Sequence, residues 1–154
     1  MKKILIVLAV IIIAIQFIPV ERTNPPVTGD IDSPVNVSAI LRNSCYDCHS
    51  NETNWPWYSY VAPVSFLVAG DVKEGREHMN FSEWDKYSGK DQTELMEEIV
   101  EEIEKGEMPL KIYTFTHPNA EMDDAKLKVI KSWVGSGTDV KGEVEFKQRY
   151  KDED

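Results

Sequence analysis

The stretch Cys45-Tyr46-Asp47-Cys48-His49 combines two cysteines and one histidine in the spacing C-x-x-C-H. On one turn of helix, residues i, i+3 and i+4 share a face, so both thiols and the imidazole are expected to point the same way. Two thiols on one face can add to the two vinyl groups of a porphyrin while the neighbouring imidazole coordinates its iron. The spacing therefore predicts one covalently attached haem c, with thioether bonds to Cys45 and Cys48 and with His49 as the proximal iron ligand.

Other chemistry for this motif has less support in the rest of the sequence. A structural zinc site needs four ligands, and the chain holds only two cysteines and three histidines in total. A thioredoxin-type redox pair needs a βαβ unit around it, and residues 30–60 show no such pattern. A simple dithiol or local disulfide is the alternative that remains to haem attachment.

The N-terminus has the pattern of an export signal. Lys2 and Lys3 precede an unbroken apolar run, Ile4–Ile15, which the sequence Gln16-Phe17-Ile18-Pro19-Val20 follows. Residues 1–20 are therefore predicted to be a signal peptide or signal-anchor. No A-x-A-like cleavage site follows, and the segment Ile4–Val20 lies at the lower end of spanning length, so we favour an uncleaved membrane anchor. Haem is attached to C-x-x-C-H sites outside the bacterial cytoplasmic membrane, so both features predict an extracytoplasmic domain on the periplasmic side.

The charge of the chain restricts its partners. The formal net charge is −10, and residues 1–20 hold two lysines and no acids, so the rest of the chain is more acidic still. Such a surface argues against nucleic acid or anionic lipid as a partner. It is compatible with a redox partner protein that offers a basic docking surface, or it simply keeps the domain soluble.

Composition divides the remaining chain into a tether, one domain and a tail. Residues 21–32 are polar with a Pro-Pro pair and are predicted to be the tether. Residues 33–137 carry helical patterns and are predicted to form one haem-binding domain, and residues 138–154 are predicted to be a charged tail. No alternating strand pattern is convincing, so we expect an all-α fold, a small cytochrome c-like domain around the haem.

Helical patterns occur at four places in this domain: from Ser33-Pro34 as N-cap and first position into Cys45, from Pro63 to near Gly75, over Lys90–Lys105 with Gly106 as the stop, and after Asp123 as N-cap. Residues 107–120 are expected to be a loop. Residues 50–60 are expected to form an irregular loop over the haem edge. Its aromatic side chains could shield the porphyrin, donate hydrogen bonds to its propionates or form plain core: Trp55, Trp57, Tyr58 and Tyr60.

The distal iron ligand must come from another part of the chain. Met108 is favoured because Pro109 restricts a loop that can deliver a thioether to the iron face opposite His49. His78 and His117 are the alternatives, and either would give bis-His ligation. An open or water-bound iron is the last alternative.

Several segments together resemble a known family. Residues 45–57 (CYDCHSNETNWPW) look like the small bacterial "haem-binding domain" family. Its pattern is also similar to Pro63-Val64-Ser65, Gly75-Arg76, Asn80-Phe81-Ser82-Glu83-Trp84, Gly106-Glu107-Met108-Pro109 and His117-Pro118-x-Ala120. The order of parts resembles class I cytochrome c, although the aromatic segment 51–90 is long for that class. The resemblance covers residues 35–136 and implies haem binding, without defining a physiological partner.

The residues and the resemblance together predict a monohaem c-type cytochrome that carries single electrons outside the cytoplasm. In such a protein the chain supplies ligands, dielectric and docking surface rather than bond-making residues, so we expect an electron carrier and not an enzyme. Ligation by His49 and Met108 would raise the reduction potential relative to bis-His ligation. The alternatives are a haem-based sensor or ligand-binding module, and an accessory domain of a peroxidase-like system.

Overall fold

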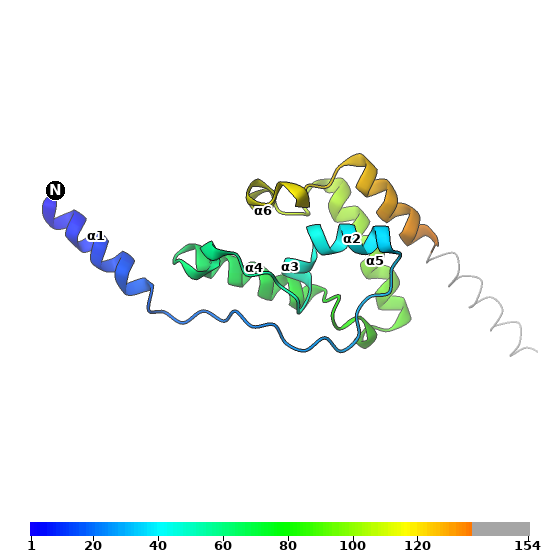
Figure 1. The fold of residues 1–154 in the computed structure, drawn as a ribbon, viewed down its shortest axis with the longest axis horizontal. Coiled ribbons are helices and arrows are strands. Elements are labelled where there is room, and N and C mark those ends of the chain that lie inside the picture. The colour runs from blue at the N-terminus through cyan, green and yellow to red at the C-terminus, as the bar shows by residue number, and fades with distance from the viewer. Residues whose placement is uncertain (137–154) are drawn as a thin grey trace, which may run out of the picture.

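The computed structural model describes residues 1–136, and every regular element in them is helical (Figure 1). Within this range the only strand-like feature is an isolated parallel bridge between Gly29 and Glu83, so the predicted all-α class is confirmed. The elements are α1 (Lys2–Ile15), α2 (Val35–Ser44), α3 (Tyr46–His49), the 3-10 helix η1 (Trp57–Tyr60), α4 (Val64–His78), η2 (Trp84–Lys86), α5 (Gly89–Lys105), α6 (Lys111–Thr116), η3 (Pro118–Ala120) and a last helix that includes residues 124–136.

Local signals set the ends of α5 close to the predicted bounds. Ser88 and Asp91 form a capping box at its start, in which the Ser88 hydroxyl oxygen accepts the Asp91 backbone N–H. Gly106 ends the helix in the left-handed conformation, with φ of 71°, and its N–H donates to the Glu102 and Ile103 carbonyls. This glycine stop is the predicted one.

Other helix bounds differ from the prediction. The first domain helix begins at Val35, because the Pro34 carbonyl already accepts the Ser38 N–H at 2.8 Å and Pro34 is therefore the N-cap. Ser33 does not cap this helix. The α4 helix continues to His78, beyond the predicted end near Gly75. Residues 107–120 are not simply a loop, because α6 and η3 lie within them.

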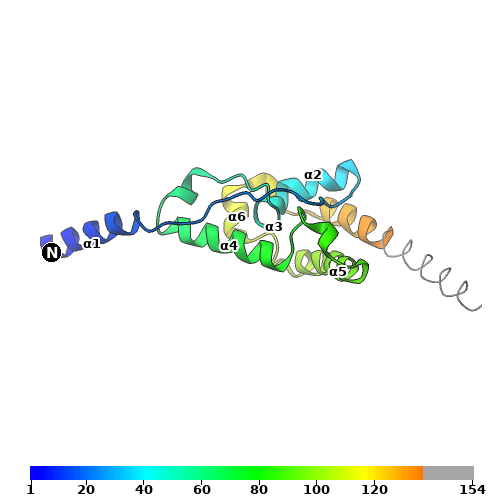
Figure 2. The ribbon, with the colours of Figure 1, turned by 90° about the horizontal axis from the view of Figure 1, so that it is seen from below.

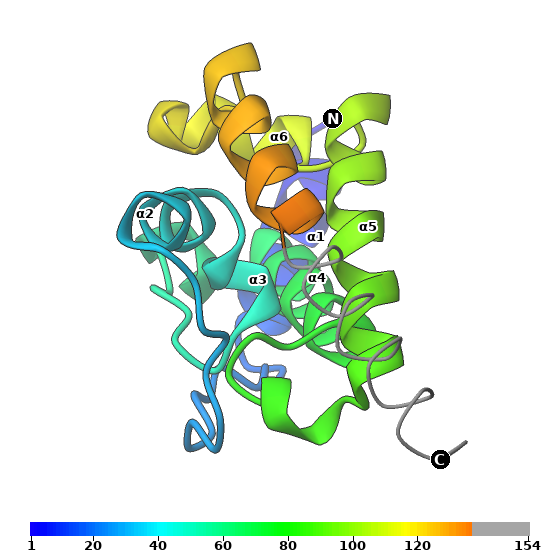
Figure 3. The same cartoon turned by 90° about the vertical axis from the view of Figure 1, so that its right-hand side faces the viewer.

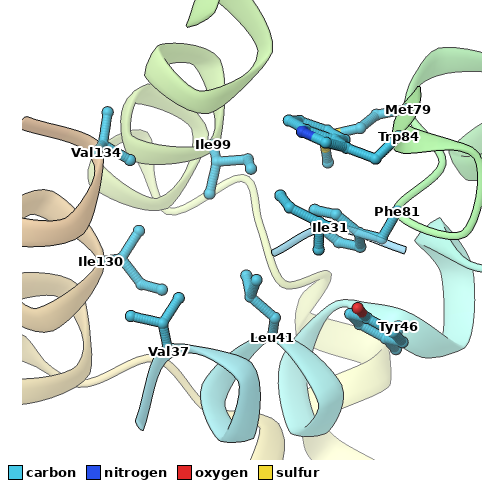
Figure 4. Close-up of a cluster of buried hydrophobic side chains, with 10 residues drawn as sticks. All are labelled: Ile31, Val37, Leu41, Tyr46, Met79, Phe81, Trp84, Ile99, Ile130 and Val134. Carbon is cyan, nitrogen blue, oxygen red and sulfur yellow. The ribbon is translucent and has the colours of Figure 1, made fainter. Parts of the chain in front are cut away.

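The core joins an aromatic stack to an aliphatic cluster (Figure 4). The Phe81 ring is fully buried and lies 5.2 Å from the Tyr46 ring and 5.9 Å from the Trp84 ring, measured between centroids. The aliphatic side comes from α2, α5 and the last helix, with these residues: Val37, Leu41, Ile99, Ile130 and Val134. Burial of these side chains fixes the helices around the C-x-x-C-H turn.

The predicted tether packs against the domain instead of hanging free. Backbone N–H groups of Thr28 and Gly29 donate to the Ser82 carbonyl, at 3.0 and 3.2 Å. The N–H of Ile31 donates to the Phe81 carbonyl, and the N–H of Trp84 donates to the Gly29 carbonyl. Residues 21–32 therefore form a strap that runs along the domain, visible as the blue segment beneath α3 and α4 in Figure 1.

The apolar N-terminal helix α1 extends from one end of the domain (Figures 1 and 2). It has no buried residue and ends at Ile15, before residue 20, the predicted limit of the signal segment. After it, the Gln16 side chain donates to the Ala62 carbonyl and accepts the Ala62 N–H, both at 3.0 Å.

Residues 1–136 include no helix with the length and apolar character needed to cross a membrane. The spanning anchor helix predicted from the sequence is therefore not found. The predicted charged tail, residues 138–154, lies outside the described residues.

Candidate functional site

The C-x-x-C-H motif forms a single helical turn at the end of α2. Cys45 follows α2 directly, and its N–H donates to the Leu41 carbonyl at 2.8 Å. The Cys45 carbonyl then accepts the N–H groups of Cys48 and His49, at 3.1 and 2.9 Å. These bonds place both thiols and the imidazole on one turn, as the spacing predicts. Figure 3 shows this turn, α3, between α2 and α4.

The motif opens into a groove made of two adjoining cavities of about 330 and 280 Å³. Volumes of this order suit a small-molecule or cofactor site. Six residues line both cavities: Ser44, Cys45, His49, His78, Met108 and Pro109. One cavity continues along the apolar face of α5, and the other passes between α4 and Tyr113 of α6. The groove therefore lies between α4, α5 and the segment that carries Met108.

His49 is oriented for metal binding by its neighbours. Its Nδ1 lies 3.2 Å from the Met79 carbonyl oxygen, and since a carbonyl only accepts, Nδ1–H is the donor. This tautomer leaves the Nε2 lone pair for a metal. The Phe81 N–H donates to the His49 carbonyl at 2.8 Å and fixes the backbone. Burial lowers the pKa of His49, which favours the neutral imidazole that coordination requires.

Both cysteines are free thiols and partly buried. Burial raises the pKa of Cys45 to about 12, and the neighbouring Cys48 adds to this effect. Burial likewise raises the pKa of Cys48 to about 12, with Asp71 and Asp47 as further causes. A redox dithiol works with a lowered pKa, so this environment does not favour the dithiol alternative.

Gly75 lets α4 pass directly against the motif. A Cβ atom at this position would lie 2.7 Å from the Cys48 carbonyl oxygen and 3.2 Å from the Cys48 Cβ. Real Cβ atoms do not approach a carbonyl this closely, so a larger residue would push α4 away from the cysteine. In the sequence, Gly75 is one of the residues that match the pattern of the haem-binding domain family. No local sequence pattern indicates that it packs against Cys48.

Two side chains near the motif were missed in the sequence. Asp47, one of the two variable positions of the motif, accepts the Asn54 N–H at 2.9 Å and the Tyr113 hydroxyl at 2.8 Å. Burial, followed by the hydrogen bond to Asp47, raises the pKa of Tyr113, so its hydroxyl stays protonated and donates. Asp47 and Tyr113 are 66 residues apart in the chain, and no sequence signal links them.

The structure separates the candidates for the distal ligand. Met108, with 37% of its surface exposed, and His78 both line the two cavities beside His49. His78 also lies 3.0 Å from a Glu98 carboxylate oxygen, at the groove. His117 lines neither cavity, because its ring stacks on Tyr113 with centroids 4.4 Å apart. Among the described residues, the geometry thus brings Met108 and His78 to the motif and leaves His117 outside it.

Two further methionines line the groove, whereas the aromatic residues 55–60 lie outside it. Met79 and Met122 line the cavity along α5, although the sequence assigned neither to the site. The aromatic side chains of residues 55–60 line neither cavity of the groove, so they do not cover it. Trp57 is 78% exposed and Tyr60 is also exposed, which excludes both from the core.

The groove fits a haem in its donors and its lining. It offers two thiols and an imidazole on one turn, methionine thioethers among its other lining residues and apolar side chains from α5. The Ser44 hydroxyl is buried, lines both cavities and has no hydrogen-bond partner among residues 1–136. A buried polar group without a partner is unusual, and a polar atom of a bound group would satisfy it.

Comparison with known proteins gives the same assignment. The sequence matches the haem-binding domain family over residues 10–136, a range that includes every residue of the groove. Comparisons with curated proteins and with solved structures gave no match. Because the family match covers most of the chain and the groove carries the donors for haem, the chain belongs to the haem-binding domain family.

Proposed function

We propose that this haem-binding protein is a monohaem c-type cytochrome that carries single electrons outside the cytoplasm. One observation carries the proposal: Cys45, Cys48 and His49 lie on one turn, and Met108 lines the same groove from another segment. The raised pKa of both thiols disfavours redox dithiol chemistry at this turn. In this proposal the groove holds the haem covalently through Cys45 and Cys48, and His49 and Met108 supply the two axial ligands of its iron.

Each residue of the groove has a separate task in this proposal. A bound haem supplies an iron that alternates between Fe(III) and Fe(II). Cys45 and Cys48 hold the macrocycle, and the Met79 carbonyl keeps Nε2 of His49 free to coordinate. The thioether of Met108 would raise the potential relative to a second histidine. Apolar residues of α5 limit the access of water to the same space.

Location and partners follow as parts of this proposal. The lysines and apolar run at residues 1–20 support export, so we place the domain on the periplasmic side. Four carboxylates line the groove: Asp71, Glu74, Glu98 and Glu102. Among the described residues, no lysine or arginine lines it. This charge supports a redox partner protein with a basic docking surface and disfavours nucleic acid.

A second candidate is a ligand-binding or peroxidase-like haem module. The His78–Glu98 pair at the groove favours it, because a histidine hydrogen-bonded to a carboxylate is a potential acid–base pair. In this case the sixth iron position would be open and His78 would move protons at a bound ligand. Carbon monoxide separates the two functions: an electron carrier with a firm sixth ligand binds it slowly, and an open iron binds it readily at native pH.

The visible spectrum of the haem-loaded protein tests Met108 as the distal ligand. The oxidised form should be low-spin and show the weak far-red band of sulfur-to-iron charge transfer. Met108→Ala should abolish this band and open the iron to carbon monoxide, because it removes the thioether. Met122→Ala is the matched control, since Met122 also lines the groove and should leave the band intact.

Two outcomes would contradict Met108 ligation. The band could survive in Met108→Ala, or it could be missing in the wild type while His78→Ala turns the iron high-spin. The second outcome would make the protein a bis-His cytochrome with a lower potential.

A further inference from the structure

The segment that carries Met108 is weakly held by apolar packing. Its backbone is fixed at one end, where the Glu107 and Met108 N–H groups donate to the Glu102 carbonyl. The following helix α6 has six residues and no buried side chain. Its Ile112 and Phe115 are 72% and 82% exposed. A helix this short has little stability of its own, so polar contacts must hold it on the domain.

One hydrogen bond joins α6 to the haem-attachment turn. The Tyr113 hydroxyl donates to a carboxylate oxygen of Asp47 at 2.8 Å. Asp47 is held from two further sides, since its other carboxylate oxygen accepts the Asn54 N–H and its backbone carbonyl accepts the Thr53 hydroxyl. A hydrogen bond to an ionised carboxylate is stronger than a neutral one. The acceptor is therefore a fixed point on the motif itself.

Tyr113 also forms a wall of the groove. It lines the cavity that contains Cys48 and Met108, and it lines a second cavity of about 360 Å³ on its other side. That second cavity includes Asp47 and His117, and the His117 ring stacks on Tyr113. Tyr113 is the one lining residue that these two cavities share among the described residues.

We propose that the hydrogen bond between Tyr113 and Asp47 is a latch that keeps Met108 over the iron position and so closes the sixth coordination site. The proposal rests on the proposed function, in which Met108 is the distal ligand. Tyr113 and Asp47 are positioning residues, because they act through Met108 and the wall of the groove. A closed latch gives an electron carrier, and an open latch gives a haem that binds small ligands.

Tyr113→Phe in the full, haem-loaded chain tests the latch. This variant keeps the ring and its stacking on His117 but removes the hydroxyl that Asp47 accepts. We expect a weaker far-red band and an increase of about tenfold or more in the rate of carbon monoxide binding, since a hydrogen bond to a charged group is lost. Hydrogen exchange of the backbone amides of residues 111–116 should increase in the same variant.

Tyr58→Phe is the matched control. The Tyr58 hydroxyl contacts the Thr116 hydroxyl of the same helix at 3.3 Å but makes no bond to the motif. This variant should leave the far-red band and the carbon monoxide rate at wild-type values. Asp47→Asn keeps an acceptor for Tyr113 and should lie between the wild type and Asp47→Ala. The double variant Asp47→Ala/Tyr113→Phe should bind carbon monoxide at nearly the rate of Asp47→Ala alone, because Asp47→Ala already removes the acceptor of the Tyr113 hydroxyl.

The outcomes separate failure of the latch from failure of the proposed function. A wild-type protein without the far-red band would overturn Met108 ligation and, with it, the latch that depends on Met108. A wild-type protein with the band, together with a wild-type carbon monoxide rate in Tyr113→Phe, would overturn the latch alone. An equal effect of Tyr58→Phe would also overturn it, because any loosening of α6 would then suffice.

Discussion

Two buried serines on either side of the C-x-x-C-H turn differ in their hydrogen bonds. The Ser50 hydroxyl donates to the Tyr46 carbonyl at 2.7 Å and accepts the Glu52 N–H at 3.0 Å. The Ser44 hydroxyl has no partner among the described residues, although both serines are buried. Removing a bonded hydroxyl leaves buried partners unsatisfied, whereas removing an unbonded one does not. The two positions should therefore respond differently to the same substitution.

Ser50→Ala should lower the free energy of unfolding of the haem-loaded protein by about 1–3 kcal/mol, because the Tyr46 carbonyl and the Glu52 N–H lose their partner. Ser44→Ala removes no bond within the chain, so it should lower the same free energy by less than Ser50→Ala does, and its loss measures the bond that the hydroxyl makes to the bound haem. Denaturant unfolding of both variants measures these values. An equal loss in the two variants would mean that the Ser44 hydroxyl has a partner, and the bound haem would be the first place to seek it.

At the scale of the elements, the contact between α4 and the motif depends on the missing side chain of Gly75. A Cβ there would meet backbone atoms of Cys48, which cannot move away as a flexible side chain does. Gly70 lies in the same helix, and a Cβ there would have no heavy atom within 4 Å. The two glycines thus separate crowding at the motif from the general effect of alanine in a helix.

Gly75→Ala should lower the free energy of unfolding by about 1–3 kcal/mol and reduce the yield of haem-loaded protein, because α4 must shift away from Cys48. Gly70→Ala should raise the free energy of unfolding by about 0.5–1 kcal/mol, since alanine favours the helix. Denaturant unfolding and the ratio of haem absorbance to protein measure the two effects. Equal stability of the variants would show that α4 does not need this close approach.

The elements differ in how well the sequence predicts them. The C-terminal end of α5 was predictable because Gly106 is a local stop signal. The α6 helix was not, because it buries no residue and leaves no apolar periodicity to detect. The packing of residues 21–32 was not predictable, because their polar composition gives no sign of the backbone bonds they make with residues 81–84.

At the scale of the whole molecule, Arg76 joins parts of the chain that are distant in sequence. Its guanidinium donates to the Ser50 carbonyl and the Thr53 hydroxyl after the motif, at 2.7 and 2.8 Å. It also donates to the Thr23 carbonyl and the Asn24 side-chain oxygen of the strap, at 2.9 and 3.0 Å. The planar fork of arginine can reach all of these acceptors at once. The strap is therefore tied to the segment next to the motif.

The site was only partly predictable, because some of its contacts join residues that are distant in the chain. Cys45, Cys48 and His49 are neighbours in sequence, so their spacing alone identifies them. His117 lies outside the groove because it stacks on Tyr113, and Asp47 meets Tyr113 through a bond across 66 residues. Such contacts arise only when α6 folds back on the motif. A single sequence carries no local pattern for them.

The most direct test of the account asks whether the haem is bound to the chain by covalent bonds. The intact mass of the denatured, haem-loaded protein should exceed that of the chain by the mass of one haem. A pyridine haemochrome spectrum should show both vinyl groups saturated, and Cys45→Ala should give a single-thioether adduct or no loaded protein. Haem that passes freely into acidic organic solvent, leaving a chain of unmodified mass, would contradict the account.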